Sequence, residues 1–345
     1  MKYKLVALAF VVSLTVTAIF LYSEYSSSSS KFLDTGGYIS FTVSYMESFD
    51  ITKVMICKYN LRSKKISEVF TFPLNAMYAL GVFDERSNCV YYSKEKSDNS
   101  FERINTGDQI YMYNLTTGTD TMLTEDLFAV NFIELDDDAV FFIAARQNSV
   151  YNLVLGKIDI SDGSIKYWDE TGCAATRIMS IDRERKRIYV AIYNTEEEDI
   201  AIYTAYKTGA TEVPPKHTVC SYDYDLGNKQ EVLHKDEMAI KALYILDDWL
   251  LYRADNTMAP RLDTSTISEV INLNNMEVLF QFQEYFAERG CFSRNKNGVY
   301  TLGSIGEHSS ILYFDFETKE YTPIIKSSIG SIANFQLVFF SDKTR

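Results

Sequence analysis

A repeated pair of short hydrophobic stretches, separated by polar turns, runs along most of this chain. One form of the repeat places Asp or Asn between two apolar residues just before a polar turn, and a second strand-prone stretch follows the turn. Pairs such as Thr117-Gly118 in these turns favour β-hairpins. The pattern occurs six times after residue 36, at Tyr59-Asn60-Leu61, Tyr113-Asn114-Leu115, Ile158-Asp159-Ile160, Tyr224-Asp225-Leu226, Ile271-Asn272-Leu273 and Phe314-Asp315-Phe316.

A second hairpin pattern lies between the copies of the first. Its two apolar stretches flank an acidic turn, and its copies span residues 77–92, 128–142, 177–193 and 240–252. From Asn60 to Asp315 the five intervals average about 51 residues, and two hairpins per interval give the four strands of a propeller blade. The sequence therefore predicts an all-β fold, a six-bladed β-propeller. Seven blades are the alternative, in which an insertion at residues 195–216 is a degenerate blade.

The two ends of the repeat region predict how the ring closes. Residues 37–72 contain enough strand-prone sequence for three strands, whereas residues 331–340 contain one strand without a partner hairpin. Closing the ring protects strand edges that an open sheet would expose. We therefore expect the C-terminal strand to complete the first blade.

The repeated apolar–Asp–apolar hairpin resembles the blades of TolB-like six-bladed β-propellers, over about residues 37–340. The resemblance concerns architecture rather than activity. It implies an exported protein-interaction platform, although some relatives are enzymes or peptidase gates. The pair Trp168-Asp169 occurs once and without a periodic Gly-His, which is unlike WD40 repeats.

The N-terminus predicts a membrane anchor. Residues 5–22 carry no charge and follow a short basic head, so residues 1–22 are interpreted as a transmembrane signal-anchor helix, with a cleaved signal peptide as the alternative. Residues 23–36 are a Ser-rich linker, residues 37–340 the propeller and residues 341–345 a tail. The propeller is then expected on the extracytoplasmic side of the cell membrane, attached by a single pass, or secreted if the signal is cleaved.

The net charge argues against nucleic-acid binding, and the cysteine pattern argues against a CxxC metal or redox site. The formal net charge is −13, which disfavours a nucleic-acid partner because the chain repels a phosphate backbone. The five cysteines contain no CxxC pair and are interpreted mainly as small buried residues. One or two long-range disulfides stay open as an alternative in an exported domain.

Candidate chemistry is sparse. No nucleophile elbow is present, and the three histidines, His217, His234 and His308, lie in different repeats. Acidic turn residues recur at blade spacing and have two interpretations: convergence on a bound Ca²⁺, or hydrogen bonds to backbone amides in tight turns, which the repetition favours. These residues are Asp84, Asp137, Asp182 and Asp247. No catalytic residue or metal ligand is assigned, and no cofactor is expected beyond the Ca²⁺ alternative.

The insertion at residues 195–216 breaks the symmetry of the repeat. We expect an irregular loop there, and irregular loops on rigid scaffolds are where binding residues concentrate. Its acidic run and two tyrosines are the candidate ligand-binding residues. The alternative is that the insertion is a surface loop without a binding role. They are Glu196, Glu197, Glu198, Asp199, Tyr203 and Tyr206.

These patterns together predict a membrane-anchored extracytoplasmic propeller that serves as a protein- or ligand-binding scaffold. Its expected partner is another envelope or extracellular protein. The alternative is an exported propeller enzyme, a lactonase-like or lyase-like hydrolase with a metal in the central channel. A purely structural envelope protein is the third interpretation. An enzyme requires asymmetric polar groups that converge on the axis, whereas a scaffold requires an apolar or aromatic patch on one rim.

Overall fold

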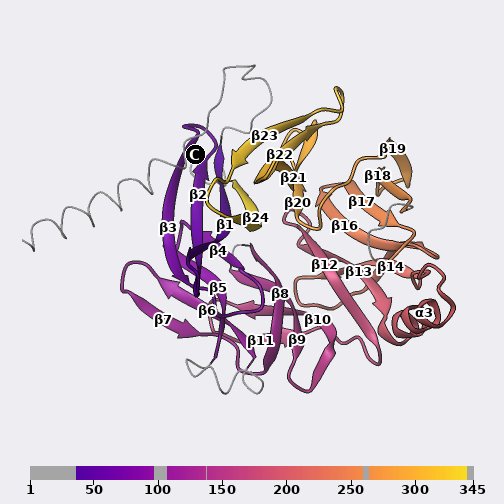
Figure 1. Ribbon diagram of the computed structural model, residues 1–345, viewed down its shortest axis with the longest axis horizontal. Coiled ribbons are helices and arrows are strands. Elements are labelled where there is room, and N and C mark those ends of the chain that lie inside the picture. The colour runs from indigo at the N-terminus through magenta and orange to yellow at the C-terminus, as the bar shows by residue number, and fades with distance from the viewer. Residues whose placement is uncertain (1–35, 97–106, 137, 259–263, 340–345) are drawn as a thin grey trace, which may run out of the picture.

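The computed structural model describes residues 36–96, 107–136, 138–258 and 264–339, and these form a ring of six four-stranded antiparallel blades (Figure 1). The predicted six-bladed β-propeller is confirmed.

In each blade the four strands follow one another outward from the channel, and the innermost strand is named first. Blade I is β24 (Ser331–Phe339), β1 (Gly37–Ser48), β2 (Ile51–Asn60) and β3 (Lys65–Pro73); blade II is β4 (Gly81–Asp84), β5 (Cys89–Glu95), β6 (Asp108–Asn114) and β7 (Thr119–Met122); blade III is β8 (Leu127–Asp136), β9 (Ala139–Arg146), β10 (Ser149–Asp159) and β11 (Ile165–Tyr167). Blade IV is β12 (Ala174–Asp182), β13 (Arg187–Asn194), β14 (His217–Asp223) and β15 (Gln230–Lys235); blade V is β16 (Ala239–Leu246), β17 (Trp249–Asp255), β18 (Thr266–Asn272) and β19 (Glu277–Phe282); blade VI is β20 (Gly290–Phe292), β21 (Gly298–Ile305), β22 (His308–Asp315) and β23 (Tyr321–Lys326).

The last strand closes the ring, as predicted. β24 pairs antiparallel with β1, from Gly37 opposite Phe339 to Ser44 opposite Ser331, and so provides the innermost strand of the first blade. The innermost strands β24, β4, β8, β12, β16 and β20 each contact the next one around the ring. No blade near the chain ends is therefore left with an open inner edge.

The hydrophobic core lies between neighbouring blades. Tyr91 of β5 and Phe142 of β9, for example, belong to one buried cluster that joins blades II and III. Every blade is sandwiched between two others, so both of its faces are apolar. The clusters form where the facing side chains of two blades pack together. Packing is close: a Cβ atom at Gly156 would lie 2.2 Å from the ring of Phe142.

Asp and Asn residues end the third strand of every blade and cap the following turn. Asn60, for example, accepts hydrogen bonds from the backbone amides of Arg62 and Ser63. In blade IV this role belongs to Asp223, not to the predicted Asp225, whose own amide donates to the Asp223 carboxylate. The sequence Tyr222-Asp223-Tyr224 fits the same apolar–Asp–apolar pattern, so the prediction for the fourth repeat is wrong by two residues.

Two of the acidic turn residues inside the blades accept local hydrogen bonds from backbone amides. Asp84 accepts from the amide of Arg86, and Asp182 accepts from the amides of Glu184 and Arg185. Asp247 adopts a left-handed backbone conformation with φ of 52°, and Asp137 lies outside the described residues. The backbone-capping interpretation is therefore confirmed for Asp84 and Asp182.

The insertion at residues 195–216 is not an irregular loop, and it is not a seventh blade. It contains α3 (Thr195–Thr208), which lies at the rim of the ring between β13 and β14 (Figure 1). Asn194 caps the helix by accepting hydrogen bonds from the amides of Glu196 and Glu197, and Gly209 ends it with φ of 70°. The acidic first turn also suits the positive end of the helix dipole.

The propeller has two different faces because its strands alternate in direction. Turns after the first and third strand of each blade lie on one side, which we call the turn face. Connections after the second and fourth strand lie on the other side, which we call the helix face because it carries α3. The chain enters β1 at Gly37 and leaves β24 at Phe339, and both positions are on the turn face.

The expected anchor, most of the linker and the tail lie outside the described residues, which exclude residues 1–35 and 340–345. Within the described ranges, no helix has the length and apolar character needed to cross a membrane. All five cysteines are free, with Cys57, Cys89 and Cys220 buried. Burial raises the pKa of the Cys57 thiol to about 12.

Candidate functional site

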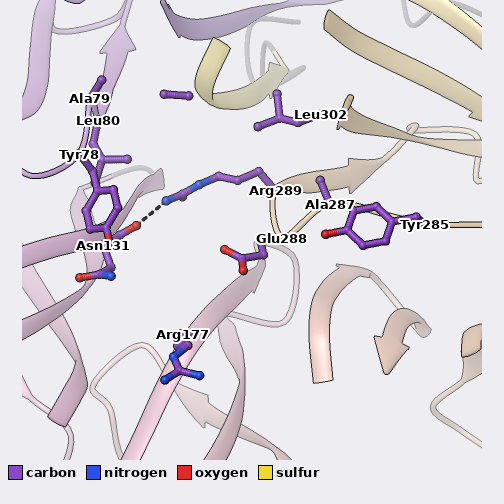
Figure 2. Close-up of a pocket in the computed structure, with 11 residues that line it drawn as sticks. Tyr78, Ala79, Leu80, Asn131, Arg177, Tyr285, Ala287, Glu288, Arg289 and Leu302 are labelled. Carbon is purple, nitrogen blue, oxygen red and sulfur yellow. Dashed lines mark hydrogen bonds between the residues drawn. The ribbon is translucent and has the colours of Figure 1, made fainter. Parts of the chain in front are cut away.

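A pocket of about 490 Å³ opens at the helix-face end of the central channel, and we call it the mouth pocket (Figure 2). Its walls come from the connection before β4, from the connection between β19 and β20, and from strands β8, β12, β21 and β24. The residues that line it are Tyr78, Ala79, Leu80, Asn131, Arg177, Tyr285, Ala287, Glu288, Arg289, Leu302 and Ala333. Ring closure thus brings together side chains that are up to 255 positions apart in sequence.

Arg289 reaches across the channel from blade VI to blade III. Its Nη2 donates a hydrogen bond to the backbone oxygen of Asn131 (Figure 2). Its guanidinium lies 3.6 Å from the ring centroid of Phe132. Within the described part of the chain, Arg289 forms no ion pair with a carboxylate, although Glu288 and Glu134 act on it electrostatically, and its Nη1 is buried without a hydrogen bond. Burial lowers the pKa of Arg289 to about 10, so the side chain remains a cation at neutral pH.

Arg177 joins the mouth pocket to α3. Its two terminal nitrogens donate to the two carboxylate oxygens of Glu198, over 2.7 and 2.8 Å. The guanidinium also lies 4.8 Å from the ring centroid of Tyr193. This two-point geometry fixes the first turn of α3 against the channel wall.

The structure separates the six residues predicted from the insertion into two groups. Glu198 is buried and faces Arg177, which lines the mouth pocket. The side chains of the other five are exposed, and Tyr203 and Tyr206 are 61% and 82% exposed. The exposed group comprises Glu196, Glu197, Asp199, Tyr203 and Tyr206.

His217 lies next to this ion pair, although its sequence context indicated no role. Its ring stacks on Tyr193 with the centroids 5.1 Å apart, and its Nδ1 accepts a hydrogen bond from the amide of Ile240. Nε2 is buried without a hydrogen-bond partner. Burial, assisted by the nearby Lys241 and Arg177 cations, lowers the pKa of His217 to about 3, so the imidazole is neutral.

Side chains fill the channel below the mouth pocket. Gln336 of β24 spans to β8, where its side chain accepts from the amide of Leu135 over 3.0 Å and donates to the carbonyl of the same residue. Arg183, in the turn after β12, pairs with Glu134 and Asp136 of blade III. A cavity of about 30 Å³ lies at this level, lined by Glu134, Arg183, Arg289 and Gln336 among others.

A second pocket of about 370 Å³ also opens on the helix face, between blades I, II and III. Asp108 lines it and accepts a hydrogen bond from the amide of Met77 over 2.8 Å. Burial raises the pKa of Asp108 to about 6. Among the described residues, no group of three His, Cys, Asp or Glu side chains is arranged to hold a metal ion.

Exposed large apolar side chains of the described residues gather on the helix face. Twelve of the sixteen lie on α3, on the connections of this face or on the adjoining strand ends, and Phe49 is 91% exposed. The twelve are Met46, Phe49, Ile51, Met77, Tyr78, Ile200, Ile202, Tyr203, Tyr206, Val213, Tyr285 and Ile305. The other four, Ile165, Met276, Val278 and Tyr321, lie on outer strands or on a turn of the opposite face.

The mouth-pocket residues were not predicted from the sequence. The only local signal is the connection of residues 283–289, which is unusually rich in charged and aromatic residues and contains Tyr285, Glu288 and Arg289. Asn131, Arg177 and Leu302 are single positions inside strands. Nothing in their local sequence indicates that they meet at the axis, because the meeting depends on closure of the ring.

Comparison with solved structures supports the architecture. A crystal structure of TolB from Acinetobacter baumannii superposes with a TM-score of 0.56 at 14% identity, over 88% of this chain and 67% of that one. A chain of a nidogen/laminin complex gives a TM-score of 0.56 at 11% identity, over 88% of this chain and 98% of that one. A structure from work on two prolyl endopeptidases gives 0.51 at 13% identity, over 88% of this chain and 43% of that one.

Comparisons of sequence provide no further assignment. No family model matches the chain, and no curated protein matches it. At such low identities the structural matches establish the fold alone. The ring of six blades and these matches agree with the resemblance found in the sequence: in its fold, this chain is a TolB-like six-bladed β-propeller.

Proposed function

We propose that this protein is a membrane-tethered, extracytoplasmic scaffold that binds another envelope or extracellular protein on the helix face of its propeller. The observation that carries the proposal is the uneven distribution of exposed apolar side chains: twelve of the sixteen on the described residues lie on the helix face, and two of these, Tyr78 and Tyr285, line the mouth pocket. Clustered aromatic and aliphatic side chains on one surface are typical of protein-interaction sites. The nidogen/laminin structure is that of a protein complex, which supports such a use of the architecture.

The turn face has a different character, which supports this assignment of faces. Its charged side chains neutralise one another between neighbouring blades, as Lys296 of blade VI does with Asp247 and Asp248 of blade V. Lys58 of blade I likewise pairs with Glu85 of blade II. These ion pairs join neighbouring blades to each other.

The position of the chain ends supports a tether on the turn face. The chain enters the propeller at Gly37 on that face, opposite the mouth pocket. A linker of residues 23–36 spans at most about 50 Å when fully extended. A tether of this kind presents the helix face away from the membrane, where a partner can reach it. No observation on the described residues specifically favours the enzyme alternative, so the binding function alone is proposed.

The binding assignment is tested by chemical crosslinking of the full-length chain in its own cells, followed by purification in detergent. The Phe49→Ser/Tyr206→Ser variant removes exposed apolar area from the helix face, and Met276→Ser/Val278→Ser removes it from the other side. We expect a crosslinked protein partner with the wild type and with the second variant, and at least a tenfold weaker product with the first. Equal loss in both variants, or no partner with the wild type, contradicts the proposal.

The tether is tested separately by protease treatment of intact cells. In untreated cells we expect the propeller in the membrane fraction, and in protease-treated intact cells we expect it to be degraded. A propeller that resists the protease until the cells are opened contradicts the proposed location. Release of the propeller into the medium contradicts the tether and supports the secreted alternative.

A further inference from the structure

The cations around the mouth pocket differ in how closely a carboxylate approaches them. Arg177, Arg289 and Lys241 are the cations at this level of the channel, and Glu198 and Glu288 are the carboxylates. Arg177 uses both of its terminal nitrogens on Glu198. Glu288 is exposed and in electrostatic contact with Arg177, Lys241 and Arg289. Glu134 and Glu288 act on Arg289 through electrostatics alone, so among the described residues Arg289 forms no ion pair with a carboxylate.

Arg289 is the cation whose side chain is preorganised for a ligand. Its stacking on Phe132 and its hydrogen bond to the Asn131 carbonyl fix the plane of the guanidinium, while Nη1 remains buried without a partner. A fixed guanidinium loses little side-chain entropy when it binds, and its planar fork matches a carboxylate. A buried hydrogen-bonding group without a partner is unfavourable, so a ligand that satisfies it gains affinity.

Asn131 adds a second polar contact beside Arg289. Its backbone oxygen receives the Arg289 hydrogen bond, and its side-chain oxygen is also buried without a partner (Figure 2). The side-chain amide can accept a hydrogen bond, or donate one if its ends are exchanged. A peptide offers both partners within one residue, because a backbone N–H lies next to each carboxyl or carbonyl group.

The walls and the size of the pocket fit a peptide segment. Tyr78 and Tyr285 are 44% and 57% exposed at its rim, and Leu80, Ala287 and Leu302 provide apolar surface. Tyr285 is supported from behind by Arg253, which lies 3.7 Å from its ring centroid and is itself buried. A volume of about 490 Å³ is within the range of pockets that hold small ligands or a few residues.

Resting on the proposed function, we propose that the mouth pocket binds one carboxylate group of a peptide segment of the partner protein, with Arg289 as the residue that contacts the carboxylate. A phosphate group, with close to two negative charges, fits less well because Glu288 and Glu198 already stand beside the site. The carboxylate has two sources in a protein, the C-terminus or an Asp or Glu side chain. The chemistry at Arg289 is the same for both.

The test uses the full-length chain in detergent and two libraries of random heptapeptides immobilised through their N-termini. One library has free C-terminal carboxylates and the other has C-terminal amides. We expect the wild type to enrich a set of peptides from the libraries. Blocking the carboxylates of these peptides should weaken their binding at least tenfold. Enrichment from the free-carboxylate library alone identifies the C-terminus, and enrichment of amidated peptides that contain Asp or Glu identifies a side chain.

Two variants place the binding in the mouth pocket. Arg289→Gln removes the contacting cation, and Arg146→Gln is the matched control, since Arg146 pairs with Asp126 on the same face but outside the pocket. We expect the carboxylate preference to vanish in Arg289→Gln and to persist in Arg146→Gln. If Arg289→Gln fails to fold by circular dichroism, Ala287→Trp, which fills the pocket and retains every charge, must abolish binding instead.

A wild type that binds amidated, non-acidic peptides as tightly as the free carboxylates overturns the inference, and so does a preference that persists in Arg289→Gln. Failure of this kind leaves the proposed function intact if crosslinking still finds a partner on the helix face. If crosslinking also finds no partner, both fail.

Discussion

Glu198 at the start of α3 and Arg177 on β12 form a two-point ion pair, and this pair connects the helix to the wall of the mouth pocket. Only 7% of the Glu198 side chain is exposed, whereas the Arg177 side chain is 42% exposed. The remaining acidic residues of the first turn face solvent. The insertion is therefore attached to the propeller through one of its charges, while the others are available on the surface.

Removing this attachment should loosen α3. In Glu198→Gln the two-point contact is lost and the Arg177 guanidinium loses its charged partner, so we expect a loss of about 1–3 kcal/mol in the free energy of unfolding. Hydrogen exchange of the amides in residues 198–208 should become faster. The matched control is Glu197→Gln in the same exposed turn, for which we expect a change within about 0.5 kcal/mol. Equal exchange rates in both variants would show that the ion pair does not hold the helix.

Closure of the ring should be sensitive to one glycine. A Cβ atom at Gly37 would lie 2.2 Å from the carbonyl oxygen of Val338, whereas a Cβ at Gly36 meets nothing within 4 Å. Gly37→Ala must displace β24 from β1, and we expect it to lower the free energy of unfolding by about 1–3 kcal/mol. Gly36→Ala should leave stability almost unchanged. Denaturant unfolding of the two variants measures the difference, and similar midpoints would contradict the described closure.

Asp108 should make a recognisable contribution to the pH dependence of stability. Burial raises its pKa from 3.8 to about 6, so the folded state binds the proton more tightly than the unfolded state. This contribution favours folding at pH values below about 4 and is lost as the pH rises through 6. Asp108→Asn removes the titration and retains an acceptor for the Met77 amide. Relative to wild type, Asn should therefore stabilise the protein increasingly between pH 4 and 7, by on the order of 1–3 kcal/mol.

The comparison with Asp108→Ala isolates the titration from the hydrogen bond. Ala also removes the titration, but it leaves the Met77 amide without its acceptor at every pH. Unfolding free energies measured from pH 4 to 7 should give parallel profiles for Asn and Ala, with Ala lower by about 1 kcal/mol. A wild-type profile parallel to both would show that the Asp108 carboxyl titrates alike in the folded and unfolded states.

The sequence predicted the strands and blades well because each hairpin carries its own local signal. The Asp or Asn cap at the end of the third strand, as at Asn60 and Asp315, marks one turn per blade wherever it occurs. The fourth copy was misassigned because the apolar–Asp–apolar pattern occurs at both Asp223 and Asp225. A local pattern cannot choose between two overlapping matches, whereas the strand register does.

The helix and the mouth pocket were harder to predict, for different reasons. α3 has helix signals in Asn194 and Gly209, but its apolar residues form no buried stripe, and so its periodicity is weak. The mouth pocket gathers residues from strands of four blades and from two connections, such as Arg177 and Arg289, whose proximity follows from ring closure. Among the predicted binding residues, Glu198 is the one connected to it.

Site-specific photo-crosslinking is the most direct test of the claim that the helix face is the binding face. A photoreactive amino acid is placed, one position at a time, at Phe49 and Tyr206 on the helix face and at Met276 and Val278 on the other side, in the full-length protein in its own cells. All four side chains are exposed, at 91%, 82%, 46% and 48%. We predict crosslinks to a partner protein from Phe49 or Tyr206 and none from Met276 or Val278. Crosslinks from Met276 or Val278 with none from the helix face would contradict the account.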